Sequence, residues 1–356
     1  PVQLGKRLGL GGEALVYQLP DGKCAKIFKS KNNSVMKKEK IRIMVRKLGA
    51  MRAVDAALMS RLAWPEKMLY NEQREWIGYI MPAFSNTHPF ADYSYDTFPA
   101  LIPNVSKADQ IRMSVALTEL VDFLHYNNIV LCDINTSNIL FDNDQNAYLI
   151  DLDSAQVAFE EKVFPTNVGL PDYLSPEHIR SCTFDFIKKK CDDVWILQNL
   201  IFKILTPCGH PYSSSIYCED DREYVEKGIY PFQFDKHPAE EKIRGGPWYN
   251  VISHLPYYLK EGFWESFHGE GKWFHEKERR PVSYWLNILV RYQEDLPALT
   301  AYDAESGKYL PSRAKKAPPP KAKVISKESS SLADFNELLK KLPLEAKKNK
   351  SWDSMV

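Results

Sequence analysis

The chain has 356 residues, and 44% of them are hydrophobic, so it is long enough for two or three packed units with real cores. Its 47 basic and 46 acidic residues give a formal net charge of +1, so no overall field favours a nucleic-acid or membrane partner, and neither is expected. The sequence has no long apolar run, no signal-peptide pattern at residues 1–12, and no C-x-x-C spacing among its six cysteines. These features predict a soluble, cytoplasmic protein with reduced thiols.

A glycine-rich turn opens the chain within residues 8–17. Gly9, Gly11 and Gly12 let the backbone turn tightly and bring free N–H groups to phosphate oxygens. A plain hairpin turn is the commoner meaning of such a pattern, so the glycines alone do not decide the function.

A strand and a helix are predicted next. Residues 23–28 alternate so that Lys26 shares a face with the small Cys24. Residues 37–48 repeat apolar side chains at helical spacing, and Glu39 is the only carboxylate among them. A glutamate at a helix start is also favoured by the helix dipole alone, so an ion-pair role for it stays one of two interpretations.

The middle of the chain alternates between helices and strands. A helical segment at residues 50–62 is followed by two strands within 67–84 and by an aromatic, proline-containing loop at 90–105. Residues 107–125 form a strong amphipathic helix. His125 at its end is interpreted as a packing or capping residue rather than a catalytic one.

The stretch from residue 129 to 153 carries the polar residues that suggest a reaction. Strands are predicted at 138–141 and 147–150, with a polar turn between them. Carboxylates at neighbouring strand ends can orient a hydroxyl nucleophile and hold a divalent metal on phosphate oxygens. The residues concerned are Asp133, Asn138, Asp151 and Asp153.

This spacing resembles the catalytic loop and metal-binding segment of the protein kinases. Asp133 and Asn138 fit the pattern D-x-x-x-x-N, and Asp151 begins a D-x-x triplet in place of Asp-Phe-Gly. The resemblance implies ATP as the phosphoryl donor, Asp133 as the residue that orients the substrate hydroxyl, and Asn138 with Asp151 as ligands of Mg²⁺ or Mn²⁺. A turn-capping role is the ordinary alternative for any one of them.

The same resemblance implies a nucleotide site. The glycine loop departs from G-x-G-x-x-G-x-V in having Ala14 at the third glycine. Lys26 would bind the α- and β-phosphates and pair with Glu39, Met81 would be the gatekeeper, and the hinge at 82–84 would bind the adenine edge through backbone groups. The expected nucleotide-binding residues are Gly9, Gly11, Gly12, Ala14, Val16, Lys26, Met81, Ala83 and Phe84.

Four residues depart from the usual protein-kinase pattern. Cys132 replaces the arginine that binds a phosphorylated activation loop, and Asn135 replaces the lysine that contacts the γ-phosphate. Leu170 replaces a threonine that supports the catalytic aspartate, and Asp153 replaces a glycine and adds a metal or lysine contact. They predict a slow enzyme that does not require activation-loop phosphorylation, and they are also what a pseudokinase would show.

Later motifs resemble the large lobe of protein kinases. Residues 169–177 end in Ser-Pro-Glu, and Asp193 begins a D-x-W helix where it would accept a hydrogen bond from the catalytic-loop backbone. An R-P pair follows at 279–281, whose arginine, expected to be Arg280, would pair with Glu177. Small-molecule kinases of the same fold lack these marks, which favours a protein substrate.

Five short motifs together are similar to one bacterial group. G-G-E-A-x-V-Y, C-A-K-I-F, G-Y-I-M-P, C-D-I-N-x-x-N and I-D-L-D-S resemble the serine/threonine kinases of the helix-hairpin-helix-associated type, some of which are encoded beside phosphatases in tellurite-resistance loci. The resemblance covers residues 4 to about 290. The sequence shows no helix-hairpin-helix, so DNA binding is not carried over.

The predicted architecture is an α+β, bilobal protein-kinase fold. It comprises a small β-rich N-lobe (1–86), a larger, mainly helical C-lobe (87–299), a basic proline-containing linker (300–330) and a tail with a short amphipathic helix (331–356). That helix would dock on its own kinase lobe or on a regulatory partner, and a fraying tail is the alternative.

The expected activity is transfer of the ATP γ-phosphoryl group to serine or threonine hydroxyls of a protein substrate, the kinase itself included. A cognate phosphatase is an expected partner, whereas nucleic acid and membrane are not. The alternatives are a nucleotide-binding scaffold and a small-molecule phosphotransferase.

Overall fold

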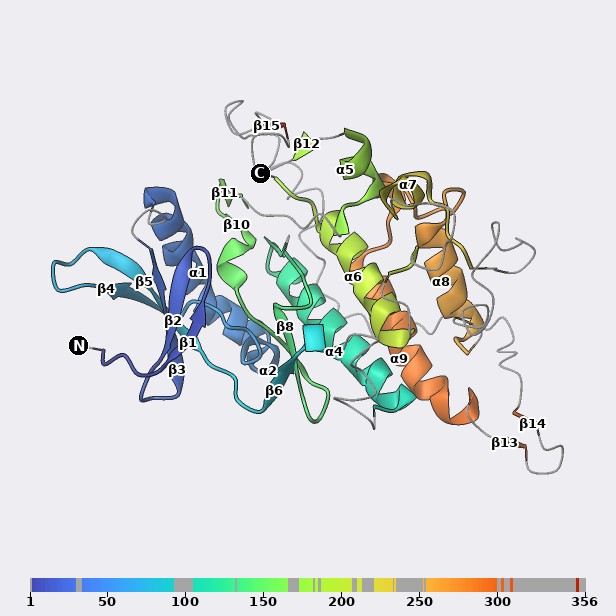
Figure 1. Cartoon of the computed structure of the whole chain (residues 1–356), viewed down its shortest axis with the longest axis horizontal. Helices are drawn as coiled ribbons and strands as arrows, with labels where there is room; N and C mark the ends of the chain where they lie inside the picture. Colours follow the sequence, from blue (N-terminus) through green and yellow to red (C-terminus); the bar gives the residue numbers. More distant parts are fainter. Residues whose placement is uncertain are drawn as a thin grey trace.

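The computed structural model describes residues 2–29, 34–92, 105–131, 133–165, 173–181, 183–184, 187–206, 210–212, 221–232, 234, 252, 254–299, 302–303, 308–309 and 350–351. Two lobes lie side by side, a sheet-rich N-terminal lobe and a helical C-terminal lobe (Figure 1). The predicted α+β, two-lobed organisation is therefore confirmed. Cys132, Leu170 and the predicted tail helix lie outside the described residues.

The small lobe is built on one antiparallel sheet. Its strand order is β1-β2-β3-β5-β4, and the register places Lys26 of β3 between Val16 and Tyr79. Gly78 allows β3 and β5 to approach, because a side-chain carbon there would lie 1.9 Å from the Lys26 carbonyl oxygen. The strands are β1 (Arg7–Leu10), β2 (Ala14–Gln18), β3 (Lys23–Phe28), β4 (Lys67–Tyr70) and β5 (Trp76–Pro82).

Helix α1 (Val35–Val54) packs beside this sheet and is longer than predicted. It begins at Ser34, whose hydroxyl accepts the Lys37 N–H at 3.1 Å, and it continues past Gly49 to Val54. Asp55 ends α1 and caps α2 (Ala56–Met59) through the Leu58 N–H at 2.8 Å. The break between the two helices therefore falls at a capping aspartate rather than at the glycine.

Short strands connect the lobes around the long helix α4 (Lys107–Tyr126). Helix α4 starts with a capping box between Ser106 and Asp109. The predicted hairpin is present, shifted by one residue at three of its four strand ends, and β6 pairs with its first strand. These elements are β6 (Thr87–Pro89), η2 (Phe90–Asp92), β7 (Ile129–Val130), β8 (Ile139–Asp142), β9 (Ala147–Leu149), η3 (Leu152–Ser154), β10 (Gln156–Phe159) and β11 (Lys162–Phe164).

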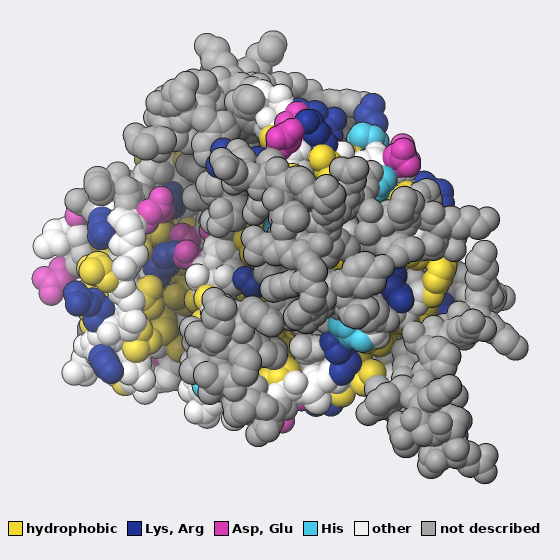
Figure 2. Space-filling view, turned by 45° about the vertical axis from the view of Figure 1, so that its right-hand side comes forward, with side chains coloured by type: hydrophobic (Ala, Val, Ile, Leu, Met, Phe, Trp, Pro, Cys, Tyr) yellow, Lys and Arg dark blue, Asp and Glu magenta, His cyan; other side chains and the backbone are white. Residues whose placement is uncertain are grey.

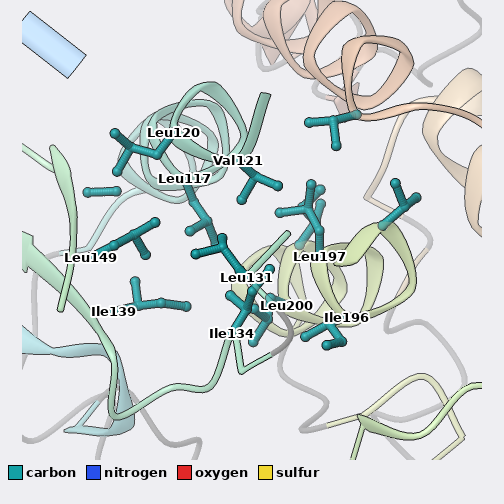
Figure 3. Close-up of a cluster of buried hydrophobic side chains, with 14 of the residues drawn as sticks. Leu117, Leu120, Val121, Leu131, Ile134, Ile139, Leu149, Ile196, Leu197 and Leu200 are labelled. Atoms are coloured by element: carbon teal, nitrogen blue, oxygen red, sulfur yellow. The ribbon is translucent and has the colours of Figure 1, made fainter. Parts of the chain in front are cut away.

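The large lobe packs around helix α6 (Lys190–Leu205), which is almost entirely buried. Figure 3 shows leucines of α4 and α6 meeting Leu131 before the catalytic loop, Ile134 within it, and Ile139 and Leu149 of the hairpin. This shared core holds the loop from below, so that its polar side chains face the other lobe. The remaining helices are α5 (Pro176–Ser181), α7 (Asp221–Lys227), α8 (Tyr257–Phe267), η6 (Glu276–Glu278) and α9 (Val282–Leu299).

Two-residue strands complete the described chain. They are β12 (Thr183–Phe184), which pairs with β15 (Lys350–Ser351), and β13 (Tyr302–Asp303), which pairs with β14 (Lys308–Tyr309). Across the described ranges, none of the helices has the length and apolar content that a bilayer span requires.

Candidate active site

A cavity of about 900 Å³ opens between the sheet of the small lobe and the hairpin segment that follows α4. Its size falls in the usual range of small-molecule sites, roughly 300–1,000 Å³. In the space-filling view, apolar side chains gather in a recess beside basic and acidic ones (Figure 2). All nine residues predicted to bind nucleotide line this cavity, as do Asp133, Asn138 and Asp151, whereas Glu39 does not.

The two ends of the cavity differ in chemistry. Near the hinge, Val16, Met81, Leu140 and Ile150 provide apolar walls suited to a flat aromatic base. The opposite end is polar and holds the lysine, the asparagine and the carboxylates. This polarity fits a ligand that is aromatic at one end and anionic at the other.

Lys26 is the centre of the polar end and is only 8% exposed. Its Nζ donates to Asp153 Oδ1 at 2.5 Å and also to Asp151 Oδ1, and the Tyr79 hydroxyl donates to the same Asp153 oxygen at 2.8 Å. Burial alone would lower the pKa of Lys26, but the charges of Asp153 and Asp151 raise it. Burial alone would raise the pKa of Asp153, but the Lys26 ammonium holds it well below its usual range. Both groups are therefore charged at neutral pH.

The predicted ion pair between Lys26 and Glu39 is wrong for this structure. Glu39 is 32% exposed at its side chain and pairs with Arg42 at 2.6 Å. Its neighbour Lys40 is buried instead and donates to the Ser154 carbonyl at 3.2 Å. One residue along a helix is a rotation of about 100°, so burying Lys40 turns Glu39 away from the cavity.

The catalytic loop holds Asp133 in a network of amide groups. Asn135 donates to Asp133 Oδ1 at 3.0 Å, and Asn138 donates to Asp133 Oδ2 at 3.4 Å. Asn135 also accepts the N–H groups of Ser137 and Asn138, so it organises the loop as well as the carboxylate. Burial raises the pKa of Asp133, the Asn135 amide lowers it, and the nearby Asp151 charge raises it further, with a net upward shift.

Asp151 adopts a left-handed backbone conformation with φ 61° and ψ 36°. Few residues other than glycine take this conformation, although aspartate and asparagine do so more often than most. Its side chain is 47% exposed and faces the cavity. The Ile150 N–H donates to the Asn138 carbonyl at 2.9 Å, which ties the Asp151 segment to the catalytic loop.

Asn138 and Asp151 have the chemistry to hold a hard cation. Mg²⁺ prefers oxygen ligands and usually binds one or two carboxylates together with substrate phosphates. Among the described residues, no group of three or more histidine, cysteine or acidic side chains forms a ready-made metal cage. The donor set therefore fits a cation that arrives with a phosphate ligand.

Asp193 of α6 supports the catalytic loop from behind, as predicted. Its carboxylate accepts the Leu131 N–H at 2.7 Å and contacts His125 Nε2 at 2.8 Å. His125 is buried there as a packing residue, which confirms that prediction too.

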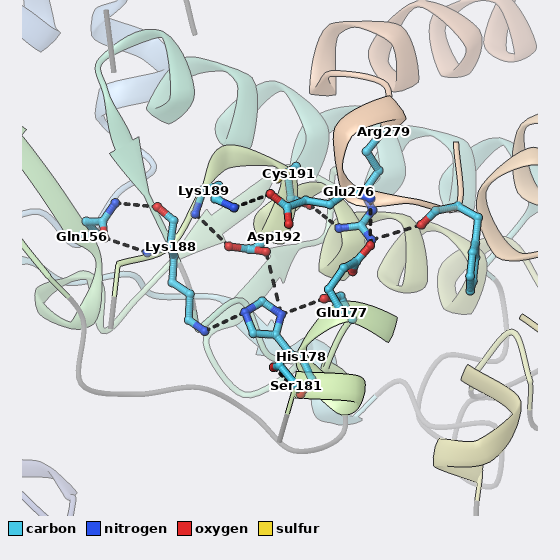
Figure 4. A network of polar contacts seen from close by, with 12 residues as sticks. Gln156, Glu177, His178, Ser181, Lys188, Lys189, Cys191, Asp192, Glu276 and Arg279 are labelled. Carbon is cyan, nitrogen blue, oxygen red and sulfur yellow. Dashed lines mark hydrogen bonds and ion pairs between the residues drawn. The ribbon is translucent and has the colours of Figure 1, made fainter. Parts of the chain in front are cut away.

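A second ion pair anchors the segment around α5 (Figure 4). Glu177 accepts two hydrogen bonds from Arg279 Nη2, at 2.7 and 2.9 Å. The prediction of Arg280 was wrong by one residue: Arg280 is exposed and lies over Trp273 at 4.9 Å. Arg279 is the residue that pairs with Glu177, and its guanidinium also lies over the Trp195 ring at 5.0 Å inside the lobe core.

Sequence reasoning missed two site residues and the bonding role of a third. The sequence predicts Tyr79 and Lys40 only as parts of a strand and of a helix, and Asn135 only as the replacement of a lysine. Two sequence features point to the first two residues: Tyr79 follows Gly78 in an alternating strand, and Lys40 is the helix neighbour of Glu39. To predict their roles, one must also know which face of the strand and of the helix is buried.

Comparison with known proteins agrees with this geometry. A family model described as the protein kinase domain matches residues 2–242. Protein kinase YegI of Escherichia coli K12 is 26% identical over 276 residues, which is 75% of this chain and 41% of that protein. The O157:H7 protein of the same name is 26% identical over 304 residues, 83% of this chain and 45% of its own. The cAMP-dependent protein kinase catalytic subunit of Dictyostelium discoideum is 32% identical over 117 residues, 32% of this chain and 17% of its own. The chain spans less than half the length of these relatives.

Proposed function

Because the chain belongs to the protein kinase family, we propose that it transfers the γ-phosphoryl group of ATP to serine or threonine hydroxyls of a protein substrate. The observation that carries the proposal is the meeting of Lys26, Asp133, Asn138 and Asp151 in one cavity with an apolar end. These residues come from three separate stretches of sequence, so their meeting is not a result of local spacing.

The residues have distinct roles in this proposal. The backbone N–H groups of the glycine loop and the Lys26 ammonium hold the phosphates, and the apolar end beside Met81 receives the adenine. Asp133 accepts the hydrogen bond of the substrate hydroxyl, and Asn135 fixes its orientation. The hydroxyl oxygen attacks the γ-phosphorus as the bond to the ADP oxygen breaks.

Asn138 and Asp151 are the proposed metal ligands. Mg²⁺ or Mn²⁺, when bound, would neutralise charge that develops on the β- and γ-phosphates. Asp151 is suited to this role because its side chain is exposed to the cavity and the bond from the Ile150 N–H to the Asn138 carbonyl joins its segment to the catalytic loop.

We also propose that the enzyme does not require phosphorylation of its activation loop. Cys132 occupies the sequence position of the arginine that would bind such a phosphate. Phosphatase-treated protein should then retain its activity, and loss of activity after treatment would contradict the proposal.

The finer identity of the kinase is likewise proposed. Similarity to the helix-hairpin-helix-associated, tellurite-resistance-locus type suggests serine/threonine preference, autophosphorylation and a cognate phosphatase as partner. The proposed lobes are residues 1–86 and 87–299, with a linker at 300–330 and a regulatory tail at 331–356. Truncation at Leu310 tests the tail, and unchanged activity and partner binding would leave it without a role.

One observation favours a nucleotide-binding scaffold as the second candidate. Asn135 replaces the usual lysine, and its amide already donates to Asp133, so it brings no positive charge to the γ-phosphate. A scaffold would bind nucleotide in the same cavity and transfer nothing.

Labelled ATP with Mg²⁺ separates the two candidates. Asp133→Asn should lower phosphoryl transfer at least ~100-fold while binding of a non-hydrolysable ATP analogue is retained, because the substitution removes the carboxylate that accepts the substrate proton and keeps the size of the side chain. Asp144→Asn is the matched control, because Asp144 is exposed on the turn of the same hairpin. Transfer that survives Asp133→Asn would refute the assignment of this residue. Nucleotide binding without transfer by the wild-type protein would identify a scaffold.

A further inference from the structure

The two carboxylates that contact Lys26 are not equivalent. The Asp151 side chain is 47% exposed and faces the cavity, whereas the Asp153 side chain is 6% exposed. The Oδ1 atom of Asp153 accepts both the Lys26 ammonium at 2.5 Å and the Tyr79 hydroxyl at 2.8 Å. The Asp151 carboxylate is therefore the more accessible to a ligand, and one oxygen of the Asp153 carboxylate already accepts two protein donors.

The low exposure of Asp153 decides between the two contacts expected from the sequence, one to a metal and one to a lysine. Asp151 and Asp153 both border the cavity, but a metal ligand needs an exposed oxygen, and the Asp151 side chain is 47% exposed against 6% for Asp153. Asp153 contacts β3 through Lys26 and β5 through Tyr79, and these two residues are paired in the sheet register. Its contacts make it a lysine partner rather than a metal ligand.

Helix α1 brings the opposite charge to the place where a carboxylate was expected. Its single acid, Glu39, pairs with Arg42 on its own helix. Its buried polar residue on this side is Lys40, whose Nζ donates to the Ser154 carbonyl at 3.2 Å. The helix therefore binds the residue next to Asp153 and contributes no anion to Lys26.

We infer that Asp153 is the positioning residue of the phosphate-binding lysine and takes the part that a helix α1 glutamate was expected to play. The inference rests on the proposed function, since it assumes that the cavity binds ATP. Lys26 stays paired with Asp153 when nucleotide binds, and Asp151 is released from Lys26 to the metal. Two carboxylates two residues apart thus divide between the lysine and the cation.

The arrangement has a consequence for control of the enzyme. Asp153 and the metal ligand Asp151 lie on one short segment, so the lysine partner and the metal site are placed together. Alignment of Lys26 then does not require a movement of helix α1 that brings in Glu39. Loss of the Glu39 charge should leave nucleotide binding intact.

The main test compares Asp153→Asn with Glu39→Gln in the full chain. Affinity for Mg²⁺ with a non-hydrolysable ATP analogue is measured by titration, KM and kcat by labelled ATP, and folding by thermal melting. Asp153→Asn should weaken nucleotide affinity at least ~10-fold, with a matching rise in KM, because a charge-assisted bond to Lys26 is lost. Glu39→Gln should change both by less than about 2-fold. Equal losses in the two variants, or none in Asp153→Asn, would overturn the inference.

A double-substitution cycle separates positioning of Lys26 from general stability. In a Lys26→Met background, Asp153→Asn should change nucleotide affinity by less than about 2-fold, because the residue it positions is gone. The same ~10-fold loss in both backgrounds would refute the inference. These are binding measurements, so they remain decisive even for a protein that binds nucleotide without transferring phosphate, the result that would refute the proposed function instead.

Tyr79→Phe replaces Asp153→Asn if the latter does not fold. It removes one hydroxyl from the Asp153 carboxylate and keeps the ring packed against Phe28 at 6.0 Å. Nucleotide affinity should fall about 3- to 10-fold while the melting temperature stays above the assay temperature. Unchanged affinity in Tyr79→Phe would contradict the inference.

Discussion

Two ion pairs join distant parts of this chain, one at the cavity between the lobes and the other inside the large lobe. Lys26 and Asp153 are 127 residues apart, and Glu177 and Arg279 are 102 residues apart. Lys26 contacts two carboxylates and lines the cavity. Neither Glu177 nor Arg279 lines that cavity, and the Arg279 side chain is 0% exposed. The first pair has a second carboxylate partner and access to a ligand, whereas the second pair lies away from the cavity with its arginine fully buried.

This difference separates a binding role from a structural one. A buried ion pair is weak evidence for stability by itself, because desolvation offsets much of the attraction. The Arg279 guanidinium is bound on several sides, by Glu177, by the Phe274 carbonyl at 3.2 Å and by the Trp195 ring. Exchange of partners is open to Lys26 and closed to Arg279.

The largest expected effect follows from removing the cation of the first pair. Lys26→Met should lower phosphoryl transfer at least ~100-fold, because the phosphates lose a charged donor in a site shielded from water. Labelled ATP measures the loss, and Lys67→Met is the control, since Lys67 is exposed on the same sheet. Equal activity of the two variants would show that Lys26 does not have the binding role assigned to it.

Removing the cation of the second pair should change stability instead. Arg279→Met leaves the half-buried Glu177 with the Glu276 N–H as a donor but without its arginine partner, and should lower the free energy of unfolding by about 1–3 kcal/mol. Denaturant unfolding measures this, and Arg280→Met is the control because Arg280 is exposed. Nucleotide affinity of folded Arg279→Met should match wild type. A selective loss of affinity with unchanged unfolding would contradict the structural role.

Two buried tyrosines, Tyr212 and Tyr79, allow the same comparison of a structural role with a binding role, with smaller expected effects on stability and affinity. The Tyr212 hydroxyl donates to the Phe267 carbonyl at 2.6 Å within the large lobe, whereas the Tyr79 hydroxyl donates to Asp153. Tyr212→Phe should cost about 1–2 kcal/mol of unfolding free energy and leave KM for ATP unchanged. A rise in KM as large as that of Tyr79→Phe would show that the structural role of the large-lobe core and the binding role of the cavity are not separable in this way.

The smallest expected effect concerns Lys107, a lysine whose surroundings lower its pKa. Burial lowers the pKa of Lys107 to about 8 from 10.5, while its Nζ donates to the Leu205 carbonyl at 2.9 Å. Below pH 8 both the folded and unfolded states bind the proton, so the burial penalty is fully present. Between pH 8 and 10.5 the folded state releases the proton first, which raises stability with pH.

Comparison with Lys107→Met isolates this contribution from other titrating groups. The unfolding free energy of wild type should rise relative to the variant by about 1 kcal/mol between these pH values, a figure reduced for partial exposure of the side chain. Denaturant unfolding at several pH values measures the difference. A constant difference would show that Lys107 keeps its ordinary pKa in the folded protein.

Much of the fold and of the cavity was predictable from sequence because the signals are local. Strand alternation, helical periodicity and turn residues predicted most elements, with ends wrong by a few residues, as at Gly49 and Asp55. The D-x-x-x-x-N spacing brings Asp133 near Asn138 within one loop, and the structure adds Asn135 as the residue that joins them. All nine residues expected to bind nucleotide line the cavity.

The sequence by itself therefore determined the two-lobed fold and which residue types meet in the cavity between its lobes. Only the tertiary structure decided the partners of the charged residues. Lys26 pairs with Asp153 rather than Glu39, and Glu177 with Arg279 rather than Arg280. The physical reason is that adjacent residues point in different directions, and the direction that is buried depends on which element packs there. That choice is made by contacts between segments more than 100 residues apart in the chain.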